Sequence, residues 1–147
     1  MPELQPLYRV RFRYPEAWHI PLAPGGGLES QFFFLAEGRC DGRIQGRFRG
    51  ANHPRRRGDG TFEPDFQGII ETDDGAVIYF EYRGYGRAYP PDARQIVSSA
   101  THLCADERYR WLNDVVCVGT GEVRGAAGGP LELTVDVMEL VWAPLAD

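Results

Sequence analysis

Apolar and polar residues alternate along most of this chain with a period of two, which is typical of β-strands that bury one face. Between Leu7 and Tyr14, aromatic and aliphatic side chains alternate with arginines. Comparable runs, separated by turns rich in Gly and Pro, predict about eight strands and no helix longer than about two turns. The predicted strands are Leu7–Tyr14, Phe32–Ala36, Arg43–Arg49, Phe62–Glu71, Val77–Arg83, Thr101–Ala105, Tyr109–Arg124 and Leu131–Trp142.

The strongest local signal is a hairpin centred on Asp74-Gly75. This dipeptide lies between two runs rich in β-branched and aromatic residues, and Asp-Gly favours a type I′ turn because both central residues of that turn have positive φ. We therefore expect residues 62–71 and 77–83 to form the arms of one antiparallel hairpin. The segment 84–91 is predicted to be a loop, and 92–97 a short helical turn.

Glycines recur inside the predicted strands, at Gly46, Gly68 and Gly119, which favours a strongly coiled sheet. The fold class is therefore predicted to be all-β, a single closed antiparallel β-barrel of about eight strands. A two-sheet sandwich explains the pattern less well, because closure leaves no edge strand to protect and gives polar faces an interior to line.

Length and composition restrict the class of protein further. The 147 residues fit one domain, expected to span residues 1–147, and the net charge of −5 disfavours nucleic acid or an anionic membrane as the main partner. Cys40, Cys104 and Cys117 lack motif spacing and are interpreted as reduced, buried cysteines. No signal peptide is evident, and no apolar segment approaches the ~20 residues of a membrane span, so a cytoplasmic protein is expected.

Candidate chemistry lies on the two arms of the hairpin. Asp65 and Gln67 on the first arm share parity with Tyr79, Glu81 and Arg83 on the second. If this face lines an apolar lumen, burial raises the pKa of a carboxyl group and makes it a usable acid or base near neutral pH. Tyr79 would then donate to a carbonyl and Arg83 would bind an acidic ligand. Asp65, Tyr79, Glu81 and Arg83 are the predicted catalytic residues.

The opposite assignment of the two faces is equally compatible with the alternation. In that arrangement Glu81 and Arg83 form a cross-strand ion pair outside the barrel, while Ile78, Phe80 and Tyr82 fill the interior. A period of two defines two faces of a strand but does not say which one points inward.

Four further residues are predicted to bind substrate: Tyr82, Trp111, Asn113 and His53. Tyr82 carries a phenol that donates to a carbonyl in this prediction. Asn113 either presents its amide to a ligand at the barrel mouth or satisfies backbone groups of its own loop. The aromatic content of 12% favours an apolar pocket, although aromatic residues also fill barrels that bind nothing.

No sequence motif requires a metal or a cofactor. His19, His53 and His102 lie far apart, and their convergence with an acid such as Asp65 on a metal ion is one hypothesis, with ordinary polar histidines as the alternative. The chain contains no nucleophile elbow, His-Glu-x-x-His, Cys-x-x-Cys or phosphate loop. We therefore predict a protein without a cofactor or a bound metal.

Several blocks of sequence resemble one family. The blocks 34–50, 72–79 (TDDGAVIY), 109–113 (YRWLN) and 118–121 (VGTG) are similar in order and spacing to the DUF3237 family, also called UPF0311, from about Leu7 to Val141. The resemblance implies a small single-domain β-barrel, similar in kind to the barrels of allene oxide cyclase and certain spirotetronate cyclases. It supplies no agreed catalytic residues, and likeness of fold does not determine chemistry.

The chain departs from the usual family pattern at two places. Gly50-Ala51-Asn52-His53-Pro54 stands where many relatives have a Gly-Gly-Ala-Asp-Trp-like block, and Gln67 follows Asp65 where an arginine is common. If these positions line the pocket, we expect the ligand to differ from those of the relatives.

The leading functional hypothesis is a cofactor-independent barrel enzyme, of the isomerase, cyclase or hydratase/dehydratase type, acting on a hydrophobic aromatic or polyketide-like small molecule. A protein that binds such a molecule without turnover is the alternative. A third hypothesis is assembly into a homo-oligomer, with Arg9, Arg11 and Arg13 contacting a partner subunit.

Overall fold

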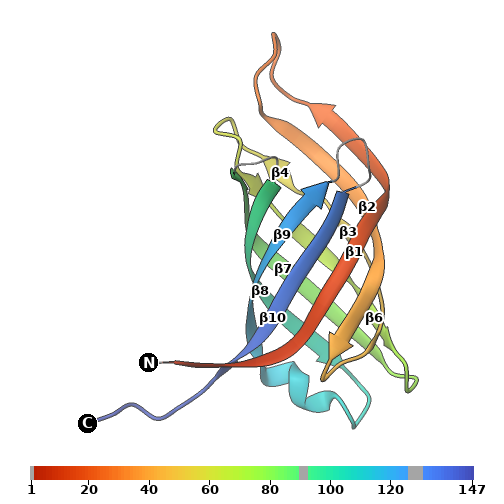
Figure 1. Ribbon diagram of the computed structural model, residues 1–147, viewed down its shortest axis with the longest axis vertical. Coiled ribbons are helices and arrows are strands. Elements are labelled where there is room, and N and C mark those ends of the chain that lie inside the picture. Colours follow the sequence, from red (N-terminus) through yellow and green to blue (C-terminus); the bar gives the residue numbers. More distant parts are fainter. Residues whose placement is uncertain (1, 90–92, 126–130) are drawn as a thin grey trace.

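The first long strand, β1 (Glu3–Pro21), is hydrogen-bonded on one side to β2 (Ser30–Gly42) and on the other to β10 (Leu131–Val141), and this double pairing closes the sheet. The computed structural model describes residues 2–89, 93–125 and 131–147. The wall is completed by β3 (Gly46–Asn52), β6 (Asp65–Thr72), β7 (Val77–Tyr89), β8 (Ala93–Cys104) and β9 (Val116–Gly125), each antiparallel to its neighbours (Figure 1). The predicted closed antiparallel barrel of eight strands is confirmed.

The two ends of the barrel are built differently (Figure 1). At one end the short strands β4 (Arg55–Arg56) and β5 (Phe62–Glu63) join β2 to β7 beyond the ends of β3 and β6, and the β1–β2 hairpin projects past them. At the opposite end the 3-10 helix η1 (Arg110–Asp114) buries Leu112 completely. The lumen is therefore plugged at the η1 end.

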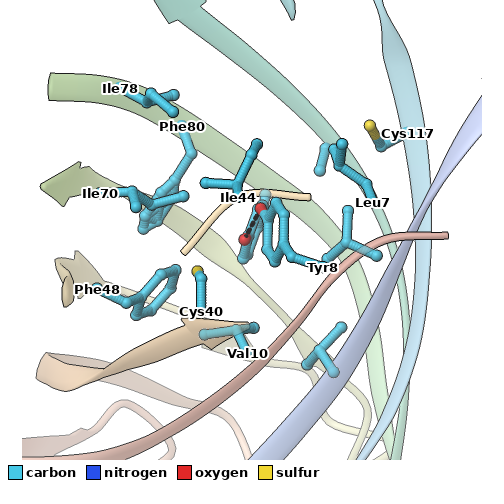
Figure 2. Close-up of a cluster of buried hydrophobic side chains, with 14 of the residues drawn as sticks. Leu7, Tyr8, Val10, Cys40, Ile44, Phe48, Ile70, Ile78, Phe80 and Cys117 are labelled. Atoms are coloured by element: carbon cyan, nitrogen blue, oxygen red, sulfur yellow. Dashed lines mark hydrogen bonds between the residues drawn. The ribbon is translucent and has the colours of Figure 1, made fainter. Parts of the chain in front are cut away.

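The interior is filled by one face of every long strand. On β7 this face consists of Ile78, Phe80 and Tyr82, which are at most 5% exposed. The side chains of β7 pack against those from β1, β2, β3 and β6, as the close-up of the core shows (Figure 2). Phe80 is central, with its ring centroid 4.5 Å from that of Phe48 and 5.3 Å from that of Phe66.

The central hairpin forms as predicted, but its turn lies one residue earlier than expected. Glu71 pairs with Val77, and the N–H of Gly75 donates to the carbonyl of Thr72 at 3.0 Å. Asp73 and Asp74 are therefore the central residues of the turn, and Gly75 follows them with φ of +92°. This is a three-residue hairpin loop ending in a residue with positive φ, so the predicted type I′ turn at Asp74-Gly75 is wrong.

Strand pairing overrides several local signals. The prediction of a loop over residues 84–91 is wrong for 84–89, which continue β7 because they pair with β8, while 90–91 lie outside the described residues. A Cβ on Gly84 would lie 2.0 Å from the Val97 carbonyl oxygen. The predicted helical turn is wrong for residues 93–97, which begin β8, while Asp92 lies outside the described residues. The segment Tyr109–Arg124, predicted to be one strand, begins with η1 and continues as β9. The first strand, predicted to end at Tyr14, continues past Pro15 through a register shift. The first arm of the hairpin, predicted to be one strand over 62–71, is divided at Pro64 into β5 and β6.

A small polar network lies in the apolar core. The hydroxyls of Tyr8 and Tyr82 are hydrogen-bonded to each other, and Tyr8 also bonds to His102 Nε2 at 2.7 Å. Which atom donates in each of these two bonds depends on the tautomer of His102, whose other ring nitrogen is Nδ1. That Nδ1 is buried without a partner in the described part of the chain. Burial lowers the pKa of His102 to about 4, so the ring is neutral at physiological pH.

Close contact between β3 and β6 depends on a pair of glycines. Gly50 and Gly68 face each other across the ladder, and a Cβ on Gly68 would lie 2.2 Å from the Arg49 carbonyl oxygen and 2.6 Å from Phe80 Cζ. We expect Gly68→Ala to lower the free energy of unfolding by roughly 1–3 kcal/mol, because the backbone and the ring must both move. Urea unfolding measures the change.

Gly58→Ala is the matched control for this substitution, because nothing lies within 4 Å of its added Cβ and its φ is not positive. Its effect on the free energy of unfolding is expected to stay below about 1 kcal/mol. If the two substitutions changed the free energy of unfolding equally, the close contact of Gly68 with Arg49 and Phe80 would not be what makes glycine necessary there.

Burial of His102 predicts a dependence of stability on pH. The pKa of His102 is lower in the folded state, about 4 against an ordinary value of 6.5, so the unfolded state takes up the proton first as the pH falls. The free energy of unfolding is therefore highest above pH 6.5, where His102 is neutral in both states, and it falls as the pH is lowered towards 4. Between these values the wild type should lose roughly 3 kcal/mol more than His102→Asn in urea unfolding.

Tyr8→Phe supplies the control, because it removes the hydrogen bond to His102 but keeps the buried imidazole. It should retain the pH slope of the wild type. Parallel pH profiles for wild type and His102→Asn would contradict the assignment of a buried neutral ring.

Candidate functional site

A cavity of about 100 Å³ opens into the lumen at the end capped by β4 and β5. Its wall is mainly apolar, with a few polar side chains among aromatic and aliphatic ones. The lining residues are Phe12, Tyr14, Phe34, Asn52, Pro54, Phe62, Pro64, Phe66, Tyr82, Gly86, Arg94, Ile96, Ser98, Val123, Leu131, Leu133 and Val135. Concave sites with an apolar wall and few polar groups are typical of small-molecule binding, although ~300 Å³ or more is usual for a whole drug-sized ligand. An apolar cavity of about 150 Å³ holds one benzene molecule, so this smaller cavity has room for at most one aromatic ring.

A larger hollow of about 620 Å³ lies outside the barrel, across β1, β9 and β10. Its wall is made of charged and small polar residues, and Arg9 and Asp136 within it form an ion pair at 2.6 Å. Arg13 pairs in the same way with Glu132 at 3.6 Å. This surface lacks the apolar wall that a hydrophobic ligand needs, so we place the candidate site in the lumen.

Tyr14 is the best-placed hydrogen-bond donor in the cavity. Asn52 Nδ2 donates to the Tyr14 hydroxyl at 2.9 Å, and Asn52 Oδ1 in turn accepts from the backbone N–H of Asp65 at 3.2 Å. The Tyr14 proton is not used in this bond and has no acceptor among the described side chains. Burial raises the pKa of Tyr14 to about 12, so the phenol stays protonated and able to donate.

Arg94 supplies a positive charge to the same cavity. Its guanidinium lies over the ring of Phe62 with the central carbon 4.0 Å from the ring centroid, and its Nε is buried without a hydrogen-bond partner. Gly86 makes room for the arginine, because a Cβ there would lie 3.2 Å from Arg94 Cδ. Burial, and secondly the charge of Arg56, lower the pKa of Arg94. Arg94 and Tyr14 thus place a cation and a neutral donor at one apolar site.

The predicted catalytic residues Asp65, Tyr79, Glu81 and Arg83 lie on the outer face of the barrel. Arg83 pairs with Asp65 at 3.1 Å, its cross-strand neighbour, and Tyr79 donates to Glu81 at 2.9 Å. The expectation that they line the lumen is wrong, because the alternate residues Ile78, Phe80 and Tyr82 fill the interior. The alternative assignment of the faces is the observed one, although Arg83 pairs with Asp65 rather than with Glu81.

Of the predicted substrate-binding residues, Tyr82 alone lines the cavity. His53 lies on the outer face, where its Nε2 bonds to Gln67 Oε1 at 3.1 Å. Trp111 and Asn113 belong to η1 at the plugged end, away from the cavity. Asn113 holds η1 to β8 by bonding both backbone groups of Cys104, at 2.7 and 3.1 Å, which is the backbone-satisfying role considered for it.

The histidines do not converge on a common point. His19 lies on the projecting hairpin and bonds to Ser30 at 2.8 Å, His53 is on the outside, and His102 is in the core. Within residues 2–89, 93–125 and 131–147, no group of His, Cys, Asp and Glu side chains is arranged to hold a metal ion. The same residues include no helix long and apolar enough to cross a membrane. Cys40, Cys104 and Cys117 are free thiols and buried, as predicted.

The site residues Tyr14, Asn52 and Arg94 were not singled out by sequence reasoning. The signal for Tyr14 was present, because it continues the apolar face of the first strand. Asn52 belongs to a block that we expect to depart from the usual family pattern, and its side chain lines the cavity. Arg94 lay in the segment predicted to be helical, so its position could not be inferred.

Comparisons with solved structures place the fold among known barrels. The chain is similar to a β-barrel-like protein from Acinetobacter baumannii (TM-score 0.78, 21% identity, covering 96% of this chain and 97% of that one). It is also similar to a protein of unknown function from Clostridium acetobutylicum (TM-score 0.81, 15% identity, 96% and 100%). A third is described as an enzyme from Penicillium herquei (TM-score 0.68, 20% identity, 92% and 94%). At these identities the likeness establishes the fold alone.

The comparison with curated proteins found no significant match. A family model, described as a protein of unknown function (DUF3237), matches residues 2–140. This confirms the resemblance seen in the hairpin and in the blocks around it. With a match over nearly its whole length and the barrel fold to support it, the chain belongs to the DUF3237 family.

Proposed function

We propose that this protein is a cofactor-independent barrel enzyme that binds a hydrophobic, aromatic or polyketide-like molecule in the lumen and isomerises, cyclises, hydrates or dehydrates it. The observation that carries the proposal is the Tyr14 hydroxyl, which lines an apolar cavity, is oriented by Asn52 and keeps its proton free. The fungal neighbour described as an enzyme is compatible with it.

The chemistry follows from the groups in the cavity. A neutral phenol in an apolar site donates a strong hydrogen bond to a substrate carbonyl or phenol oxygen, and Arg94 stabilises negative charge that develops there. The proposed reaction classes are redox-neutral and need no electron carrier. This agrees with a sequence that lacks the common cofactor motifs. A tightly bound redox cofactor or metal, detected by mass spectrometry of the purified protein, would contradict this part of the proposal.

A second candidate function is binding of the same class of molecule without turnover. It is favoured by the composition of the cavity wall, since no Asp, Glu or His is among the described lining residues to act as a general base. The two functions can be told apart by a substitution in the cavity. In an enzyme the substitution lowers the rate of product formation while the affinity for the substrate is kept, whereas a binding protein forms no product in the first place.

Tyr14→Phe separates the two candidates. With an aromatic ketone or phenol that binds the wild type, we expect this variant to keep its affinity within about tenfold but to lower kcat by roughly 10²–10³, as for removal of one oxyanion donor. Liquid chromatography with mass spectrometry detects the product as an isomer of the substrate or as a species that differs by one water. Binding without any product in the wild type would favour the second candidate.

Tyr79→Phe is the matched control, because it removes the same hydroxyl from the outer face. Its kcat should equal that of the wild type. Loss of activity in Tyr79→Phe, with Tyr14→Phe unaffected, would overturn the assignment of the lumen as the site and return the chemistry to the outer face of the hairpin.

A further inference from the structure

Two arginines lie over the ring of Phe62, which is part of the cavity wall. The guanidinium carbon of Arg94 lies 4.0 Å from the Phe62 ring centroid, and that of Arg56 lies 5.3 Å from it. The Nε atoms of both are buried and have no hydrogen-bond partner. No carboxylate of residues 2–89, 93–125 or 131–147 forms an ion pair with either one.

Arginines on the outer wall are arranged differently. Arg9 pairs with Asp136 at 2.6 Å, Arg43 with Glu139 at 2.9 Å and Arg47 with Glu37 at 2.7 Å. Several exposed arginines thus have a carboxylate partner, whereas the partly buried Arg56 and Arg94 form no ion pair with a carboxylate of the described residues, although their charges lie in a less hydrated place. Two like charges that lie near one another and are partly desolvated raise the free energy of the empty site, and an anion bound beside Arg94 lowers it.

The surroundings of Arg94 restrict the kind of anion. The aromatic rings of Tyr14, Phe34 and Phe66 line the cavity, and its volume of about 100 Å³ suits one ring rather than a large polar group. A planar guanidinium binds a planar carboxylate through two parallel hydrogen bonds, which matches the geometry of an aryl acid. The Tyr14 proton, which has no acceptor in the described residues, is available to the same carboxylate.

We propose that the ligand of this cavity is an aromatic carboxylate whose ring lies in the apolar lumen and whose anionic group is bound by Arg94 and Tyr14, with Arg56 adding positive charge at the rim. The inference rests on the proposed function, since it names the class of molecule that the same cavity takes. It adds a charge requirement that the proposed function does not contain.

The test compares benzoate with benzyl alcohol, which has the same ring but no charge, by isothermal titration calorimetry on the full chain. Wild type should bind benzoate at least about tenfold more tightly than benzyl alcohol, and Arg94→Met should remove this preference, because a hydrogen-bonded charge is worth that much. Binding of benzyl alcohol should change by less than about twofold, since methionine keeps the apolar stem of arginine.

Arg87→Met is the matched control. Arg87 lies on the same strand as Gly86 but is exposed and does not line the cavity, so this variant makes the same change in net charge without touching the site. It should bind both probes as the wild type does. An equal loss of benzoate binding in Arg87→Met and Arg94→Met would show a diffuse effect of charge and overturn the inference.

A measurement on the wild type alone keeps the test independent of whether Arg94→Met folds. Benzoate affinity should weaken as the salt concentration rises, and benzyl alcohol affinity should not. If benzyl alcohol binds and benzoate binds no more tightly, the anion inference fails while the apolar cavity of the proposed function stands. If neither probe binds, both proposals fail.

Discussion

Pairing of β1 with both β2 and β10 is the constraint on which the rest of the structure depends. Once the sheet is closed, every long strand has two hydrogen-bonded neighbours and one face of each must point into a lumen of fixed width. Large side chains then fill that lumen, and small residues are needed where the walls or the rings come closest. The facing glycines Gly50 and Gly68, beneath the rings of Phe66 and Phe80, are the clearest result of this requirement.

Closure of the barrel also explains why few polar atoms in the lumen are available to bind a ligand. An apolar lumen makes every unpaired polar group costly, and in the core Tyr8, Tyr82 and His102 bond to one another, with His102 Nδ1 left without a partner among the described residues. At the η1 end the lumen is sealed, whereas at the β4–β5 end the packing stops short and leaves the cavity. Among the described residues there, Tyr14 keeps a proton without an acceptor and Arg94 has a buried Nε without a partner, and a bound ligand would satisfy them.

The two blocks that we expect to differ from the usual family pattern lie at different places in the barrel. Asn52 and Pro54 of the unusual block line the cavity, and Asn52 orients Tyr14. Gln67, the other departure, lies on the outer face and bonds to His53. Of these two blocks, only the first therefore contributes to the candidate site. It does so through Asn52, which orients the Tyr14 hydroxyl.

The sequence by itself determined the fold class, the approximate strand count, the central hairpin and the residues that share each face of a strand, because alternation and turn chemistry are local properties. It left open which face of Val77–Arg83 is inward, since a period of two is symmetric, and it predicted a helical turn at residues 92–97 where the described part is strand. Tertiary structure decided both, by closing the sheet and pairing β7 with β8. It also assembled Tyr14, Asn52 and Arg94 from three different strands. Contacts between residues so far apart along the chain arise from closure of the barrel, and no local pattern encodes them.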